Sequence, residues 1–257
     1  DAIGFTRTKT GTNAVLNALL TEMDGFKRIN TKPVFVMAAT NLKGIDRALE
    51  RRFDRSFMVG LPNEEGRKWI LEKLLKRHVE KFRISEKEIE SIVVRSRGLS
   101  PADLENMIET ALREGIRNGT VIEDAMLDEI FERCNFGERK EENSEKEIKR
   151  IAYHEVGHAL IELYYGREPE HMSIIARGNY GGYVQGAQLK ENPTKERLLQ
   201  KICMCLGGRA AELEFGYGIT VGAGSDLENA TQIATWMVCE YGMYEDEIGL
   251  AVITKEE

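Results

Sequence analysis

Two histidines four residues apart, in the segment His154-Glu155-Val156-Gly157-His158, constrain this chain more than any other feature of its sequence. On a helix, residues i and i+4 lie on one face, so both imidazoles can reach one metal ion at about 2.0–2.1 Å. Glu155 lies beside the first histidine and can accept a proton from water that the metal activates. The pattern H-E-x-x-H also occurs by chance, so its context has to support this interpretation.

The surrounding sequence predicts the helix that such a site needs. Apolar residues recur at helical spacing and form one stripe, which comprises Ile148, Ala152, Val156, Ala159 and Leu163. We expect this stripe to be the packed face and the two histidines to point roughly to the opposite side. Ser144 and Glu147 match a capping box at the start of the helix. This context disfavours the alternative of two surface or core histidines on an ordinary helix.

Composition places the chain among ordinary globular proteins. It has 257 residues, of which 42% are hydrophobic and 31% charged, enough for about two domains. The net charge of -7, without basic runs that include aromatic residues, argues against a nucleic-acid partner.

The four cysteines show no C-x-x-C spacing, which predicts buried thiols in a reducing compartment. No stretch of 18 apolar residues occurs, so we expect this chain to be soluble and, because it lacks an initial Met, to be a fragment.

Two elements are predicted in the first 62 residues. Residues 12–25 form the pattern of an amphipathic helix that ends at Asp24-Gly25. Residues 34–39 are a short apolar run, which predicts a buried parallel strand. Thr40 and Asn41 follow at the carboxyl end of that strand, where open α/β sheets bind their ligands. This polar pair is therefore a candidate site.

A helical bundle is predicted for residues 63–136. Helix start signals occur at Asn63, at the capping box Ser85-Glu86-Lys87-Glu88 and at Ser100-Pro101. Residues 137–147 are dominated by charge, which predicts a solvated linker and a domain boundary before the helix of the two histidines.

The remaining residues, 148–257, would form the domain that holds the metal. Two strands, 172–176 and 182–187, are predicted around the loop 177–181. Two helices follow, one at 194–214 and one that opens after Ser225 and continues through Met237.

The third metal ligand is not fixed by spacing. Catalytic zinc usually has three protein ligands and one open position, so one more residue must join the two histidines. The downstream candidates are His171, Glu212, Glu214, Asp226 and Glu228. Asp226 lies in a Gly-rich turn that opens a helix, but this position equally suits a helix cap or a first-turn acid. On spacing alone, the case for Asp226 as the third ligand is about equal to that for the other four candidates together.

Longer motifs give the chain a resemblance to a known family. The histidine motif is followed by Leu206-Gly207-Gly208-Arg209-Ala210-Ala211-Glu212 and by Thr220-Val221-Gly222-Ala223-Gly224-Ser225-Asp226-Leu227. In this order the motifs resemble the peptidase domain of the FtsH family, which are membrane-anchored, ATP-dependent zinc proteases. The family's third ligand is an Asp in a Gly-Ala-x-x-Asp turn. The resemblance therefore implies that Asp226 joins His154 and His158 at the zinc, and that Glu212 anchors a helix or supports a ligand.

The N-terminal part resembles the second half of the AAA+ ATPase module of the same family. The motifs are Leu20-Thr21-Glu22-Met23-Asp24-Gly25-Phe26, Ala38-Ala39-Thr40-Asn41 and Arg52-Phe53-Asp54-Arg55. In such modules the residue that matches Asn41 orients the attacking water, and Arg52 and Arg55 match arginine fingers that act on a neighbouring subunit's nucleotide. Without the resemblance, Asn41 would be interpreted as a turn residue and the arginines as a solvated basic loop.

The chain departs from the family pattern in three places. It has no Gly-x-x-x-x-Gly-Lys-[Ser/Thr] phosphate loop. The nearest match is at residues 4–10, which lack the second glycine of that motif. The segment 48–52 is shorter than is usual before the arginines, and Pro101 stands where the family usually has Gly. We therefore expect the nucleotide site to be incomplete in this chain.

The combined expectation is the α/β remainder of an AAA+ ATPase core (1–62), an all-α lid (63–136), a charged linker (137–147) and a mainly α-helical zinc metallopeptidase domain (148–257). The resemblance implies an ATP-dependent zinc metalloendopeptidase with Glu155 as general base, Zn²⁺ as its metal, and ATP with Mg²⁺ in the complete protein.

The resemblance also implies a homo-hexamer that degrades unfolded or membrane proteins. It would be anchored by an N-terminal membrane segment, with its catalytic domains in a reducing compartment such as the bacterial cytoplasm. Two alternatives stay open: an AAA+ unfoldase or assembly factor with a vestigial peptidase site, and a stand-alone zinc peptidase unrelated to ATP. The intact metal motif opposes the first alternative, and the AAA+ motifs oppose the second.

Overall fold

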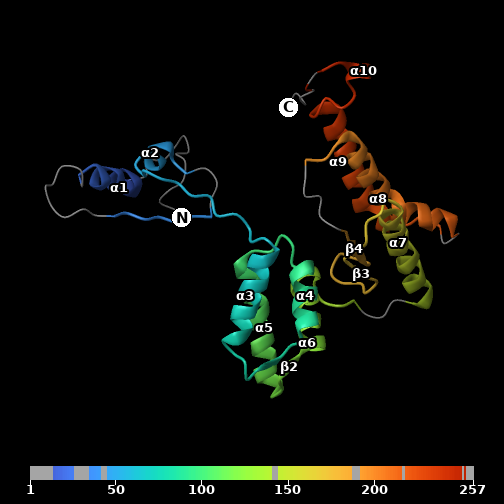
Figure 1. Cartoon of the computed structure of the whole chain (residues 1–257), viewed down its shortest axis with the longest axis horizontal. Coiled ribbons are helices and arrows are strands. Elements are labelled where there is room, and N and C mark those ends of the chain that lie inside the picture. Colours follow the sequence, from blue (N-terminus) through green and yellow to red (C-terminus); the bar gives the residue numbers. More distant parts are fainter. Residues whose placement is uncertain are drawn as a thin grey trace. The chain divides into compact units, whose positions relative to one another are not determined.

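The computed structural model describes residues 14–25, 35–41, 45–140, 144–186, 192–215, 218–250 and 252. The chain separates into two compact units, Asp1–Gly60 and Leu61–Glu257, and Figure 1 shows the helices and strands of each. Residues 4–10, which resemble a phosphate loop without its second glycine, lie outside the described residues.

The first unit contains the helices α1 (Ala14–Gly25) and α2 (Arg47–Glu50), which share a small apolar core. The helix prediction for 12–25 is confirmed in its described residues. The strand prediction for 34–39 is wrong for residues 35–39, which form no regular element, and Phe35 and Met37 are 89% and 93% exposed. A buried parallel strand requires neighbouring strands and helices on both faces. The described residues of this unit form two helices and no strand, so its α/β character is not seen there.

The predicted helical bundle begins the second unit, and we use this name for residues 61–136. Its helices are α3 (Glu64–Lys76), α4 (Glu86–Arg95), α5 (Pro101–Asn118) and α6 (Asp124–Phe136). All three predicted start signals are confirmed, since the side chains of Asn63, Ser85 and Ser100 each accept a hydrogen bond from a first-turn amide. The predicted capping box at Ser85 is incomplete. The amide of Ser85 donates to Asp124 at 2.8 Å, and not to Glu88 as the box requires.

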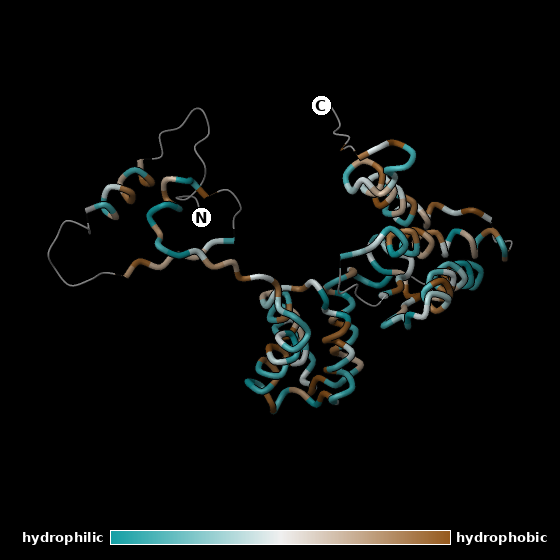
Figure 2. Tube along the Cα trace, turned by 45° about the horizontal axis from the view of Figure 1, so that its top comes forward, coloured by the Kyte–Doolittle hydropathy of each residue, from teal (hydrophilic) through white to brown (hydrophobic). Residues whose placement is uncertain are grey.

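The core of the helical bundle lies between these four helices, and its largest fully buried side chains include Leu71, Ile92, Leu104, Leu127 and Phe131. In Figure 2 apolar and polar stretches alternate along each helix, as expected where one face is buried. The expectation of a wholly helical segment is corrected by one short parallel pairing of β1 (Phe82–Arg83) with β2 (Ile122–Glu123).

The rest of the second unit is built around the helices α7 (Glu145–Tyr164), α8 (Lys195–Glu214) and α9 (Gly224–Cys239). Helix α8 packs against both α7 and α9. Between α7 and α8 in the sequence, β3 (His171–Ser173) pairs antiparallel with β4 (Tyr183–Gln185), and Met172 lies opposite Val184. A 3₁₀ helix, η1 (Val221–Ala223), leads into α9, and a short α10 (Glu245–Ile248) follows it. Both predicted strands and both predicted helices are therefore confirmed, the strands being shorter than expected.

The packed face of α7 is not the one that its apolar pattern predicts. Ile148, Val156 and Leu163 of the stripe are 41%, 38% and 52% exposed, whereas His154 and Glu155 are buried. The expectation that the histidines point away from the packing face is therefore wrong. The reason lies in the close approach of α7 and α8 at two glycines, since a Cβ on Gly157 would lie 2.4 Å from the carbonyl oxygen of Gly207.

Two further expectations are resolved in the described residues. Residues 138–140 of the charged linker are exposed, as predicted, and their backbone is bonded to the segment 176–178, because Lys140 donates its amide to Ala176 and Glu138 accepts from Gly178. The four cysteines carry no disulfide, but Cys134 and Cys203 are exposed, so the prediction of buried thiols is wrong for them. In the part of the chain that the structure describes, no helix is both long enough and apolar enough to span a bilayer.

Candidate metal centre

Three side chains from two helices converge on one point. His154 Nε2 is 3.1 Å from Asp226 Oδ2 and 3.1 Å from His158 Nε2, and His158 Nε2 is 3.4 Å from Asp226 Oδ2. Two ligands that bind zinc tetrahedrally at 2.0–2.1 Å stand about 3.3 Å apart. The two nitrogens and the oxygen are therefore spaced as a shared zinc ion requires, and they leave a fourth position open.

The sequence folds locally so that these side chains meet. Helix α7 begins at Ser144, whose side chain accepts from the Glu147 amide, and carries both histidines on its buried face. Asp226 lies in the first turn of α9, where the helix dipole favours an anion. The chain enters α9 through η1, and Gly224 at their junction has helical angles, φ -60° and ψ -50°.

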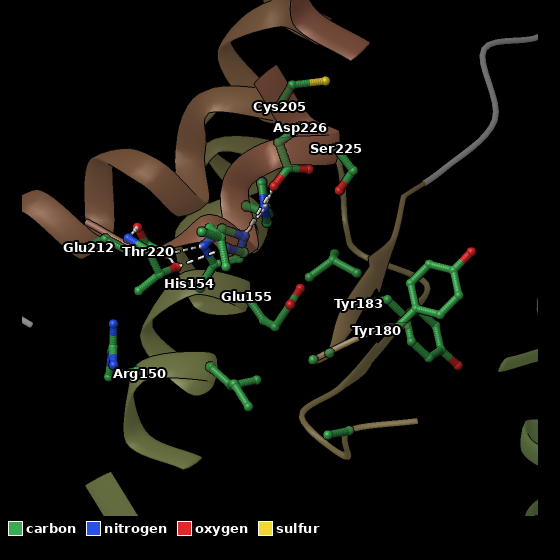
Figure 3. Close-up of a pocket in the computed structure, with 18 of the residues that line it drawn as sticks. Arg150, His154, Glu155, Tyr180, Tyr183, Cys205, Glu212, Thr220, Ser225 and Asp226 are labelled. Atoms are coloured by element: carbon green, nitrogen blue, oxygen red, sulfur yellow. Dashed lines mark hydrogen bonds and ion pairs between the residues drawn. The ribbon is translucent and has the colours of Figure 1, made fainter. Parts of the chain in front are cut away.

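Each imidazole is oriented through its other nitrogen. His154 Nδ1 lies 2.9 Å from Glu212 Oε1, and His158 Nδ1 lies 2.7 Å from the carbonyl oxygen of Met204. Because Nδ1 of each ring is held by these acceptors, Nε2 points toward Asp226 and is the nitrogen that a metal would bind. Glu212 is held in turn by Thr220, whose hydroxyl and amide donate to it at 2.7 and 3.1 Å. Figure 3 shows Glu212 and Asp226 on opposite sides of the His154 ring.

Burial and charge compete at these groups. Burial would raise the pKa of Asp226, but hydrogen bonds from His154 and His158 outweigh it and lower that pKa well below its usual range. Burial would lower the pKa of both imidazoles, and the bonds with Asp226 raise it instead. Burial raises the pKa of Glu155 to about 7, against the positive charge of the neighbouring histidines. The site therefore combines an anionic ligand with a carboxyl group that exchanges a proton near neutrality.

Glu155 and residues of the strand β4 line a cleft of about 780 Å³. Its side chain is 6% exposed, and Figure 3 shows it projecting from α7 toward the segment of Tyr180 and Tyr183. The backbone of Gly182 passes so close that a Cβ there would lie 2.9 Å from Glu155 Oε1. The carboxylate and the three converging atoms thus line the same cleft, with a strand edge beside them.

Sequence reasoning did not identify the glycines that shape this site. A Cβ on Gly208 would lie 2.6 Å from Nε2 of both His154 and His158, and a Cβ on Gly207 would lie 2.6 Å from the carbonyl oxygen of Gly157. These glycines allow α8 to lie directly against the histidines. The available signal was glycine inside a helical pattern, which has a conformational cost and so requires a packing reason.

The other sequence candidates lie elsewhere. His171 Nε2 is 4.0 Å from Glu132 Oε1, and Glu214 and Glu228 are exposed. In the first unit, Asn41 and Arg55 are exposed, whereas Arg52 pairs with Asp24 through Nη2 and Oδ2 at 2.6 Å. The nucleotide-associated roles of Asn41, Arg52 and Arg55 stay predictions.

Two family models match this chain, one at each end. Residues 141–257 match the model of peptidase family M41, and residues 1–61 match that of the ATPase family associated with various cellular activities (AAA). The chain is 43% identical over 249 residues to ATP-dependent zinc metalloprotease FtsH 1 of Methylacidiphilum infernorum, covering 92% of this chain and 38% of that protein. It is 41% identical over 242 residues to ATP-dependent zinc metalloprotease FtsH of Mesomycoplasma conjunctivae, covering 89% and 31%. The chain thus spans about a third of the length of these curated relatives.

Proposed function

Because the chain belongs to the FtsH family, we propose that it carries the peptidase centre of an ATP-dependent zinc metalloendopeptidase. One observation carries this proposal: Nε2 of His154, Nε2 of His158 and Oδ2 of Asp226 lie within 3.1–3.4 Å of one another in a cleft that also contains Glu155. Two imidazoles and a carboxylate are a ligand set of catalytic zinc that leaves a position for water.

The residues of the chain divide the chemistry between them. Zinc bound at these ligands would supply Lewis-acid catalysis, polarising a peptide carbonyl and activating water. Glu155 accepts the proton of the attacking water and returns it to the leaving amine. Glu212 and the Met204 carbonyl keep the imidazoles in the orientation that presents Nε2. Substrate adds to the edge of β4, which keeps its backbone extended beside Glu155.

The family and the AAA match support a proposal for the activity of the whole protein. ATP with Mg²⁺ drives the unfolding of folded substrates and the transfer of polypeptide to the peptidase cleft, and the substrates include unfolded and membrane proteins. Asn41 orients the attacking water at the nucleotide, and Arg52 and Arg55 act on the nucleotide of a neighbouring subunit, which requires a ring such as a homo-hexamer. The protein is anchored to a membrane through another part of its chain, with the catalytic domains in a reducing compartment such as the bacterial cytoplasm.

Metal analysis and peptide cleavage on the same samples test the peptidase proposal. The purified chain should contain about one zinc, and a chelator should remove both the metal and the cleavage of unfolded protein. Glu155→Gln keeps the shape of the side chain but cannot accept a proton, so it should retain zinc and lose cleavage. His154→Ala should lose both. Zinc bound without cleavage by the unaltered complete protein would favour an unfoldase with a vestigial peptidase site instead.

A further inference from the structure

The strand β4 is held on two sides by different parts of the second unit. Toward α7, its preceding residue Gly182 lies against Glu155. On the second side, the helical bundle forms hydrogen bonds with β4 and with the residue after it. Gln185 donates its side-chain amide to the carbonyl oxygen of Val94 at 3.0 Å, and Arg97 donates to the carbonyl oxygen of Gly186 at 3.0 Å. The strand that lines the cleft is therefore attached to α4 and to the residues just after it.

Glu132 of α6 makes the most buried of these attachments. It is 5% exposed, and its Oε1 accepts from Tyr183 Oη at 2.7 Å and from Arg95 Nη1 at 2.9 Å. Because Tyr183 belongs to β4 and Arg95 to α4, one carboxylate joins the strand to two helices of the helical bundle. The ring of Phe136, at the end of α6, stacks on the Tyr183 ring with centroids 4.3 Å apart.

The second oxygen of Glu132 is not satisfied in this arrangement. Oε2 is buried without a hydrogen-bond partner, and so is Nε of Arg177, which lies 3.9 Å away. A buried polar atom without a partner costs free energy, so a small displacement that brings these two atoms together has a driving force. Arg177 is held meanwhile by a bidentate pair with Glu129, at 2.6 and 2.8 Å. A shift of less than about 1 Å would bring these two atoms within hydrogen-bond distance.

We propose that Glu132 is a positioning residue of the peptidase cleft: through Tyr183 it fixes the place of β4 relative to Glu155, so that the helical bundle sets how a substrate backbone is held. This inference rests on the proposed function only in assigning β4 to substrate alignment. The link between α6 and β4 itself is independent of the chemistry.

The variant Tyr183→Phe tests the link, because it deletes the hydroxyl and leaves the ring that stacks on Phe136. Glu132→Gln removes the charge at similar shape. The matched control is Glu114→Gln on α5, which breaks an ion pair with Arg133 of α6 that involves neither β4 nor Glu132. Each variant is made in the 257-residue chain, loaded with zinc and assayed with an unstructured fluorogenic peptide. Backbone hydrogen exchange of residues 182–185 is followed in parallel.

In Tyr183→Phe, we expect amide exchange at 182–185 to be about three- to tenfold faster, as for the loss of one hydrogen bond. In Glu132→Gln, we expect a change in the same direction, because an amide oxygen accepts a weaker bond from Tyr183 than a carboxylate does. We also expect KM to rise by a similar factor, with kcat and zinc content within twofold of the original chain, because alignment contributes to binding. Glu114→Gln should change neither quantity.

Unchanged exchange and KM in Tyr183→Phe, or equal changes in Glu114→Gln, would overturn the inference. If the original chain fails to cleave the peptide, the proposed function fails, and hydrogen exchange still decides whether Glu132 positions β4.

Discussion

Replacing Gly208 by alanine should abolish tight zinc binding, although Gly208 is not a ligand. The added Cβ would lie 2.6 Å from Nε2 of both His154 and His158, whereas ordinary contact begins at 3.4 Å. Each ring would have to move by about 0.8 Å, which exceeds the roughly 0.2 Å by which zinc–ligand distances vary. The helices cannot separate instead without disrupting the backbone contact of Gly157 with Gly207.

The magnitude follows from the loss of ligand orientation. Disturbing the groups that orient zinc ligands costs about 10- to 100-fold in affinity, and here both rings are displaced at once. We therefore expect a loss of at least about 100-fold in zinc affinity, or about 2.8 kcal/mol. Competition with a chromophoric zinc chelator measures this constant directly. Thermal unfolding of the metal-free variant reports separately any loss of packing.

Gly224→Ala is the matched control for this substitution. Gly224 opens the helix of Asp226, has helical φ and ψ, and would bring its Cβ within 4 Å of no atom outside its own helical turn. Alanine is favoured over glycine in a helix, so this variant should bind zinc as the original chain does. Zinc affinity of Gly208→Ala within threefold of that of Gly224→Ala would refute the reasoning from ring displacement.

Four other outcomes are expected. Asp226→Asn should weaken zinc binding by more than about 100-fold and Glu212→Gln by about tenfold, because one removes a ligand charge and the other a support of a ligand; equal losses in the chelator assay would contradict this. Ser100→Ala should cost about 1 kcal/mol in denaturant unfolding, because it removes a complete capping box. Leu127→Ala should cost about 2–5 kcal/mol, because Leu127 is fully buried, and a smaller loss would show that the core relaxes. ATP should bind this chain weakly or not at all by calorimetry, and Arg55→Ala in the complete protein should lower ATP turnover without emptying the nucleotide site.

Elements with local signals could be predicted from the sequence. Ser144, Ser100 and Thr194 each accept from a first-turn amide and mark the starts of helices that the pattern also indicated. The hairpin of β3 and β4 was equally visible, because two apolar runs flank a loop with glycines. Such signals depend on neighbours in the sequence and need no tertiary information.

The failures concern elements whose state depends on distant partners. The apolar run at 35–39 can form a strand only beside other strands of a sheet. The described residues of the first unit contain no such strand. The convergence of Asp226 with His154 is likewise invisible to spacing, because 72 residues separate them. Only the packing of α9 on α8, and of α8 on α7, brings Asp226 to the two imidazoles.

The orientation of α7 was nevertheless encoded in its glycine. A glycine inside a helix costs about 1 kcal/mol relative to alanine, so Gly157 and Gly207 indicate a close approach more strongly than the apolar stripe does. Gly157 lies between the two histidines, and therefore the face of α7 that comes closest to α8 is the face of the imidazoles. This approach also explains why α8 supplies both Nδ1 partners, Met204 and Glu212. The same helix contact that buries the imidazoles thus also orients them for a metal.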